Sequence, residues 1–152
     1  MKKICLDVGN TCITYCEINK KIGPINRFSS SKDLFKKFDN NNFKEVLISS
    51  VVPNISKDIN IFFAKKNINV FEVSYKNCGI NLKVKTPSEV GNDRICNVAA
   101  ANKLYGYGSI IIDFGTATTY DITNHKGEFI GGAIAPGIDV SADNLISKAS
   151  LL

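Results

Sequence analysis

The sequence has very little arginine, since only Arg27 and Arg94 among its 19 basic residues are arginines. Lysines carry the remaining positive charge and are spread along the chain from Lys2 to Lys148. Nucleic-acid-binding proteins usually gather their basic residues on one face. The net charge of +5 therefore indicates a solvated, lysine-rich surface and no nucleic-acid partner. Arg94 is a candidate functional residue, because a rare arginine often holds a specific anion.

The chain also lacks the long apolar segments of exported and membrane-spanning proteins. No apolar run approaches the roughly 18–20 residues that cross a bilayer. The first apolar run is broken at Asp7, which makes it too short for the core of a signal peptide. We therefore predict a cytoplasmic protein with no membrane partner.

The five cysteines form no CxxC pair, and their number is odd. With only one histidine available, this spacing disfavours a zinc site, and it favours reduced thiols in a cytoplasm. We expect Cys5, Cys12 and Cys16 to be small core residues within strands. His125 lies in TNHKGE between two apolar segments, and we interpret it as an exposed turn residue.

The hydrophobic periodicity predicts an α/β protein. A length of 152 residues suits one ordinary domain, and 44% of the residues are hydrophobic, which allows a sizeable core. A short helix is expected after Ser30 or Ser31, either of which can cap it. Other helices are expected over 54–66, 92–105 and 138–149, an extended segment over 79–84, and strands over 2–8, 12–18, 25–29, 45–52, 69–73, 109–113, 117–123 and 128–134.

A strand–turn–strand–strand pattern occurs twice, and in each copy a glycine follows two residues after an aspartate. The first copy is DVGNTCITY from Asp7, and the second is DFGTATTYD from Asp113. An aspartate at the end of a buried strand is costly unless it meets a charged ligand. The glycine allows the backbone to approach a ligand closely.

The residues beside these two turns offer hydroxyl and amide donors, namely Asn10, Thr11, Thr116, Thr118 and Thr119. If the hairpins face each other, they form a cleft suited to ATP and Mg²⁺. The donors would surround the phosphates, and the carboxylates would hold the metal directly or through its waters. The alternative is a pair of structural hairpins with ordinary Asp-x-Gly turns.

Gly91-Asn92-Asp93-Arg94 stands at the start of the alanine-rich helix expected over 92–105. In one interpretation it is only a helix cap with an acidic first turn. In the other, Asp93 accepts a proton from a substrate hydroxyl, and Arg94 binds a substrate carboxylate or amide oxygen. The helix N-terminus would add donors for an anion.

A last cluster of small and rigid residues lies near the end of the chain. Gly131-Gly132 and Pro136-Gly137 allow close approach of the backbone to a nucleotide. The alternative is that these residues serve turns alone.

Together these segments resemble the type III pantothenate kinases, a bacterial family that shares the actin/Hsp70/sugar-kinase fold. The resemblance covers essentially the whole chain. It rests on four motifs in order, DVGNT (Asp7–Thr11), TPSEVGNDR (Thr86–Arg94), DFGTATT (Asp113–Thr119) and GGAIAPG (Gly131–Gly137). It implies a ribonuclease H-like, actin-like α/β ATPase fold with duplicated mixed β-sheet units, flanking helices and an incomplete second unit. The implied activity is ATP-dependent phosphorylation of pantothenate to 4'-phosphopantothenate, the first step of coenzyme A biosynthesis.

The same resemblance implies roles for individual residues. The Gly91–Arg94 segment would bind pantothenate, with Asp93 as the proton acceptor. Asp113 would hold a monovalent cation, potassium or ammonium, and Thr116 would contact ATP. The family works as a homodimer, with the substrate site near the subunit interface. The residues that match the family's ATP phosphate-binding segment are Asp7, Val8, Gly9, Asn10, Thr11, Cys12, Ile13 and Thr14.

Two features depart from the family. Val84 occupies a position where members often have a tyrosine that contacts pantothenate. The other departure is length, because 106 residues separate Asp7 from Asp113 but only 39 follow Asp113. Those 39 suffice for three strands and one helix, and not for a further strand–helix–strand portion. We therefore expect a first subdomain over 1–106 and an incomplete second subdomain over 107–152.

These departures leave two alternatives to an active pantothenate kinase. A truncated chain could keep its nucleotide contacts, lose turnover and act as a regulatory or accessory protein. A kinase of the same fold could also act on another small hydroxyl compound, which the change at Val84 leaves open.

Overall fold

The computed structural model describes residues 2–40 and 43–149 and shows two compact units. Unit 1 comprises residues 1–77 and 91–93, and unit 2 comprises residues 78–90 and 94–152. The division of the duplicated halves at residue 106 is drawn from the sequence repeat and stays a prediction.

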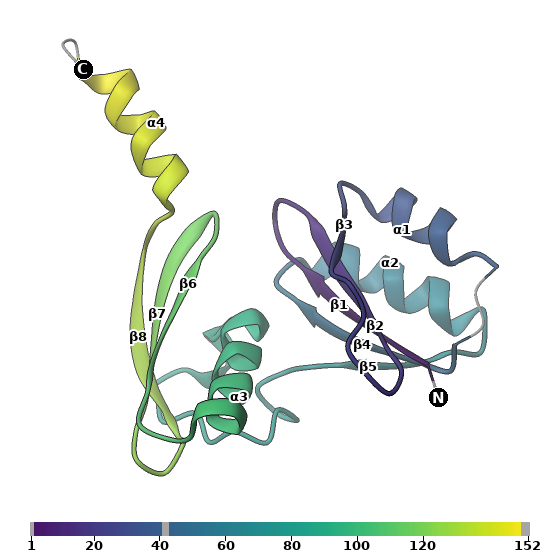
Figure 1. Ribbon diagram of the computed structural model, residues 1–152, viewed down its shortest axis with the longest axis horizontal. Coiled ribbons are helices and arrows are strands. Elements are labelled where there is room, and N and C mark those ends of the chain that lie inside the picture. The colour runs from purple at the N-terminus through teal and green to yellow at the C-terminus, as the bar shows by residue number, and fades with distance from the viewer. Residues whose placement is uncertain (1, 41–42, 150–152) are drawn as a thin grey trace. The chain divides into compact units, whose positions relative to one another are not determined.

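Unit 1 is built on a five-stranded mixed sheet in the order β3-β2-β1-β4-β5 (Figure 1). Strands β1, β2 and β3 are antiparallel, whereas β4 runs parallel to β1 and β5 runs parallel to β4. Because β1 and β4 are parallel neighbours, their carboxyl ends meet at one edge of the sheet. The strands are β1 (Lys3–Val8), β2 (Ile13–Ile18), β3 (Asn26–Phe28), β4 (Glu45–Ser50) and β5 (Asn69–Glu72).

Helices α1 (Ser31–Phe38) and α2 (Pro53–Ala64) lie over one face of this sheet (Figure 1). Ser30 is the residue that caps α1, because its hydroxyl accepts a hydrogen bond from the Asp33 N–H at 3.3 Å. Alternation along the strands points every second side chain into the core beneath the helices. The fully buried members include Ile4, Val8, Leu34, Phe38, Val46, Ile59 and Phe63.

Unit 2 is built on a three-stranded antiparallel sheet in the order β6-β7-β8. The polypeptide at Asn81–Lys83 runs along β8, where Asn81 accepts from the Phe129 N–H and Lys83 donates to the Phe129 carbonyl. The extended segment expected over 79–84 is confirmed at residues 81–83, whereas residues 79, 80 and 84 lie in bends. The unit contains η1 (Pro87–Glu89), most of α3 (Asn92–Tyr105), β6 (Ile110–Phe114), β7 (Ala117–Thr123), β8 (Phe129–Pro136) and α4 (Ile138–Lys148).

The order and type of the expected elements are confirmed. The expected burial is wrong for the strand ends at Asp7 and Asp113, for the strand expected over 109–113 and for the three amino-terminal cysteines. The carboxylates of Asp7 and Asp113 are exposed. Asp7 lies on the sheet face opposite the core residues Leu6 and Val8, because successive side chains alternate between faces. The strand expected over 109–113 is an exposed edge strand.

The three amino-terminal cysteines are half-buried and do not belong to the core. Cys5 and Cys16 are cross-strand neighbours on the face away from α1 and α2. Cys12 follows the tight turn after β1 and is also half-buried. His125 is exposed in a turn, as expected. Among the described helices, none is both long and apolar enough to span a bilayer.

Candidate active site

In unit 1, the start of α3 is held at the carboxyl ends of β1 and β4. The Asn92 side-chain amide donates to the Ser50 carbonyl at 3.0 Å, and the Val51 N–H donates to the Val8 carbonyl at 3.1 Å. A Cβ placed on Gly91 would lie 3.5 Å from Val51 Cγ1 and only 2.5 Å from an Asp93 carboxylate oxygen. Gly91 therefore allows the chain to bring Asp93 close to this edge of the sheet.

The first hairpin turn opens at the same edge, directly after β1. It is closed by a hydrogen bond from the Gly9 N–H to the Cys12 carbonyl at 3.1 Å, and it exposes Asn10 and Thr11. The side chains of Val8 and Ile13 are 0% and 2% exposed in the core. Of the eight residues expected to bind ATP phosphates, these two can therefore offer only backbone groups.

Asp7 has a hydroxyl neighbour on the adjacent strand that the sequence did not reveal. Ser49 of β4 is in register with Asp7, so both side chains lie on one face of the sheet. The Ser49 hydroxyl is buried and has no hydrogen-bond partner among the described residues. Buried polar groups without partners are unusual and often mark a place that a ligand or water completes.

In unit 2, Asp113 also lies across from a buried hydroxyl, which here comes from the antiparallel neighbour β7 and not from a parallel strand. The Asp113 carboxylate accepts a hydrogen bond from the Asn97 amide of α3 at 2.9 Å. Thr119 is directly across from Asp113 in β7. Its hydroxyl is also buried and without a partner in the described part of the chain. The next turn is closed by the Gly115 N–H, which donates to the Ala117 carbonyl at 3.0 Å and leaves Thr116 exposed.

Gly132 and Gly137, near the end of the chain, lie so close to neighbouring backbone atoms that no side chain fits there. A Cβ on Gly132 would lie 1.9 Å from the Tyr120 carbonyl oxygen, and one on Gly137 would lie 2.3 Å from the Gly115 carbonyl oxygen and 2.6 Å from that of Thr116. Backbone packing within β7–β8 and against the turn therefore accounts for both glycines.

Arg94 is bound by an acidic residue that the sequence analysis missed. Its Nε donates to Asp121 Oδ1 at 2.7 Å, and its Nη2 contacts the same oxygen. Asp121 is wholly buried, and the guanidinium also lies over the Phe129 ring at 5.5 Å from its centroid. One signal was available, because an aspartate inside the strand ATTYDIT needs a buried partner. Asn97 was missed because an isolated asparagine on a helix carries no pattern.

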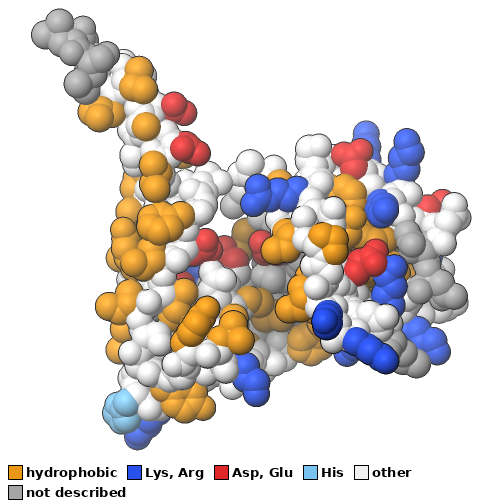
Figure 2. All heavy atoms as spheres, viewed as in Figure 1, with side chains coloured by type: hydrophobic (Ala, Val, Ile, Leu, Met, Phe, Trp, Pro, Cys, Tyr) orange, Lys and Arg blue, Asp and Glu red, His pale blue; other side chains and the backbone are white. Residues whose placement is uncertain are grey.

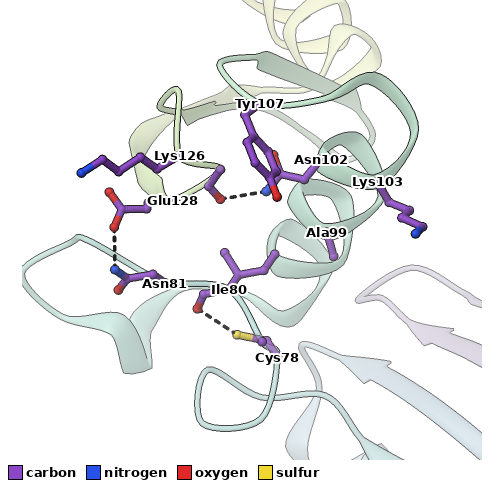
Figure 3. Close-up of a pocket in the computed structure, with 11 residues that line it drawn as sticks. Cys78, Ile80, Asn81, Ala99, Asn102, Lys103, Tyr107, Lys126 and Glu128 are labelled. Carbon is purple, nitrogen blue, oxygen red and sulfur yellow. Dashed lines mark hydrogen bonds between the residues drawn. The ribbon is translucent and has the colours of Figure 1, made fainter.

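Unit 2 also has a pocket of about 520 Å³ that is lined by no residue of the four motifs (Figure 3). On its wall, Glu128 accepts hydrogen bonds from Asn124 and Asn81, both at 2.7 Å. It also forms an ion pair with Lys83 at 3.0 Å. The hydrogen bonds from Asn124 and Lys83, with a smaller one from Asn81, lower the pKa of Glu128 from 4.5 to about 2. This cluster ties the segment before η1 to the β7–β8 turn.

Comparisons with known proteins identify the family of this chain. The family model for type III pantothenate kinases matches residues 3–152. The chain belongs to the type III pantothenate kinase family. A type III pantothenate kinase from Desulforapulum autotrophicum is 39% identical over 152 residues, covering 95% of this chain and 58% of the relative. One from Halalkalibacterium halodurans is 44% identical over 110 residues, covering 70% of this chain and 43% of the relative. The chain thus spans about half the length of these relatives.

Solved structures support the fold. A Baf family protein from Campylobacter jejuni superposes with a TM-score of 0.66 at 17% identity, covering 97% of this chain and 61% of that one. The ethanolamine utilization protein EutJ from Carboxydothermus hydrogenoformans gives a TM-score of 0.54 at 14% identity, covering 97% of this chain and 57% of that one. The fold is the actin-like ATPase fold, as the sequence motifs indicated.

Proposed function

We propose that the protein transfers the γ-phosphate of ATP to pantothenate and so forms 4'-phosphopantothenate for coenzyme A synthesis. Membership of the type III pantothenate kinase family supports this activity. The structural observation that carries the proposal is the hydrogen bond from Asn92 to the Ser50 carbonyl. It brings the segment expected to bind pantothenate to the sheet edge where the segment expected to bind ATP begins.

In this proposal, residues Asp7–Thr14 bind the ATP phosphates. The exposed turn offers the side chains of Asn10 and Thr11 as donors, and Asp7 is a hard oxygen ligand for Mg²⁺. The buried Ser49 hydroxyl beside Asp7 lacks a partner among the described residues, which fits a site that a polar ligand completes. When bound, Mg²⁺ would neutralise phosphate charge.

Asp93 would act as the general base. It stands in the first turn of α3, where the helix N-terminus favours an anionic carboxylate. The carboxylate accepts the proton of the pantothenate primary hydroxyl while that oxygen forms a bond to the γ-phosphorus. The bond between the γ-phosphorus and the bridging oxygen breaks, and ADP leaves with that electron pair. Positioning and charge neutralisation supply most of the rate in such transfers.

Gly91, Asn92 and Arg94 would bind pantothenate beside this base. Arg94 would do so as a guanidinium already oriented by Asp121. A fixed guanidinium loses less conformational entropy when it binds a carboxylate or an amide oxygen.

In unit 2, Asp113 and Thr116 would bind a monovalent cation and ATP, respectively. The donor set fits a potassium or ammonium ion, because an exposed carboxylate lies across from the buried hydroxyl of Thr119. We further propose a homodimer, in line with the family resemblance.

The test is a coupled assay of the 152-residue chain with ATP and pantothenate, with and without potassium. Pantothenate-dependent ADP formation that potassium stimulates supports the proposal. ATP binding without turnover would favour the regulatory protein. Turnover only with other small alcohols would favour the alternative kinase suggested by Val84.

A further inference from the structure

The positive charge of the protein is concentrated in unit 1. This unit contains 13 of the 19 basic residues and 8 of the 14 acidic residues, so its net charge is +5, whereas unit 2 has six of each kind. Figure 2 shows Lys and Arg side chains gathered over unit 1, while apolar side chains gather over the three-stranded sheet and along α4 of unit 2. A surface with an excess of one sign of charge attracts ligands of the opposite sign.

Unit 1 has a pocket of about 540 Å³, a volume typical of small-molecule sites. Residues that precede β1, residues of β2 and β3, their connection and α1 line it. The start of β1 lies beside the end of β2, where Lys3 pairs with Ile18 (Figure 1). From Lys3 to Val8, β1 extends for about 17 Å at 3.3 Å per residue. The pocket therefore lies at the end of the hairpin opposite the turn proposed to bind ATP phosphates.

The lining of this pocket has an excess of positive charge. It includes the side chains of Lys2, Lys21 and Lys37, and of the described residues that line it only Glu17 is acidic. Lys2 and Glu17 form an ion pair at 2.7 Å. The formal charge of the lining is therefore +2. This value complements the charge of about −1.5 to −2 that a phosphate monoester carries at neutral pH.

One wall of the pocket is a fixed aromatic ring. Tyr15 is only 7% exposed, and its ring stacks on that of Phe28 with 4.7 Å between centroids and meets the edge of Phe38 at 5.3 Å. Asn26 of β3 is in register with Tyr15, so the two side chains lie on the same face of the sheet. The Asn26 amide donates to the Pro24 carbonyl at 3.0 Å. An aromatic wall beside an amide suits the organic part of a ligand.

The loop that carries Lys21 is ordered by hydrogen bonds within the chain. The Asn19 N–H donates to the Lys21 carbonyl at 3.2 Å, and the Gly23 N–H donates to the Glu17 carbonyl at 2.8 Å. A Cβ on Gly23 would lie 2.9 Å from that carbonyl oxygen, so glycine allows this close approach. A loop that is already ordered loses little conformational entropy when a ligand binds.

We propose that this pocket binds a small organic phosphate of the size of a sugar phosphate, at a site separate from the proposed active site. The lysines contact the phosphate group, and Tyr15 and Asn26 contact the organic part. Among the described lining residues there is no arginine. Recognition therefore depends on point charges more than on bidentate geometry, which favours a dianionic phosphate over a single carboxylate. This inference does not depend on the proposed kinase activity.

The probe is ribose 5-phosphate, and calorimetric titration of the full 152-residue chain measures its Kd. Ribose presents the same sugar without the phosphate, and succinate is a dianion with two separated carboxylates. We expect ribose 5-phosphate to bind at least about tenfold more tightly than either compound. Absence of binding, or binding of ribose or succinate as tight as that of ribose 5-phosphate, would overturn the proposal.

Two variants with the same net charge test the position of the site. Lys21→Gln/Lys37→Gln removes two charges from the lining and should raise the Kd for ribose 5-phosphate by about tenfold or more. Lys20→Gln/Lys36→Gln removes two charges from residues that do not line the pocket, and the Kd should change by less than about twofold. All four lysines are exposed, so both variants should fold. Equal effects of the two variants would indicate attraction by diffuse charge and would overturn the proposed site.

An NMR titration of the amide groups shows where ribose 5-phosphate binds. The largest shifts should occur at Gly23 and Asn26, and the amides of Asn10 and Thr11 at the other end of the hairpin should change little. Shifts centred on Asn10 and Thr11 would place the phosphate in the proposed ATP site and would overturn the proposal. None of these measurements requires turnover, so a negative kinase assay leaves their outcome unaffected.

Discussion

Arg94 and Asp121 form an ion pair in which the carboxylate is completely buried and the arginine side chain is only 15% exposed. The pair joins the first turns of α3 to the central strand of the unit 2 sheet. Two guanidinium nitrogens contact one oxygen, so the arginine is held in a defined orientation. A residue predicted to bind substrate is thus also part of the packing of unit 2.

Replacing Asp121 with asparagine should destabilise the protein strongly. The change leaves the Arg94 charge without its buried counter-charge, and breaking such a pair costs about 3–5 kcal/mol. Urea unfolding of Asp121→Asn measures the loss. Asp113→Asn is the matched control, because that carboxylate is exposed and its loss should cost far less. Equal effects of the two changes would contradict a structural role for the ion pair.

Asp93→Asn should lower the kcat of pantothenate phosphorylation by roughly 10²–10⁴-fold, because the amide cannot accept the hydroxyl proton. The KM for pantothenate should change much less. Steady-state kinetics check both values, with the exposed Asp58→Asn of α2 as the control. Near-normal turnover of Asp93→Asn would contradict the role of Asp93 as the general base.

Ser49→Ala should show whether the buried Ser49 hydroxyl contacts a ligand or serves only the packing of the sheet. Removing a buried hydroxyl without a partner should leave the free energy of unfolding unchanged or raise it by up to about 1 kcal/mol. If the hydroxyl meets ATP or its metal, the Kd for ATP should rise several-fold in calorimetry. Ser56 of α2 has a similarly buried hydroxyl without a described partner, so Ser56→Ala should keep the ATP affinity. Equal affinities in both variants would exclude Ser49 from the site.

Gly137→Ala should disturb the second hairpin turn. Its φ of −64° suits any residue, so the cost arises only from the clash of a new Cβ with the Gly115 and Thr116 carbonyls. We expect a loss of about 1–3 kcal/mol in thermal or urea unfolding. Gly115→Ala is the control, since its nearest contact would be an ordinary 3.6 Å.

Glu128 should contribute to stability over a defined pH range. Its folded-state pKa of about 2 lies below 4.5, so its stabilising effect is complete above about pH 4.5 and is lost as the pH falls toward 2. The stability difference between the natural protein and Glu128→Gln should therefore shrink over that range. NMR titration of the Glu128 carboxyl carbon gives the pKa directly. Glu89→Gln, at an exposed residue of η1, is the control for the loss of one surface carboxylate.

The sequence by itself determined the order of the elements and the family. Alternating and helical apolar patterns placed the strands and helices to within about two residues, because local geometry sets those periods. Four short motifs in order indicated the family that the comparisons confirmed. The cap at Ser30 and the turn at His125 could be predicted because their chemistry is local.

Tertiary structure alone decided burial and pairing. Nothing in the local pattern distinguishes Leu6, buried beneath two helices, from Ile112 at its equivalent position on an open face. The Arg94–Asp121 pair and the neighbours Ser49 and Asn97 join residues that are distant in sequence. Strand register brings Ser49 beside Asp7, whereas the position of α3 against the unit 2 sheet brings Arg94 to Asp121 and Asn97 to Asp113. Two copies of one local pattern can therefore fold alike and still differ in burial, because burial depends on which other elements pack against each copy.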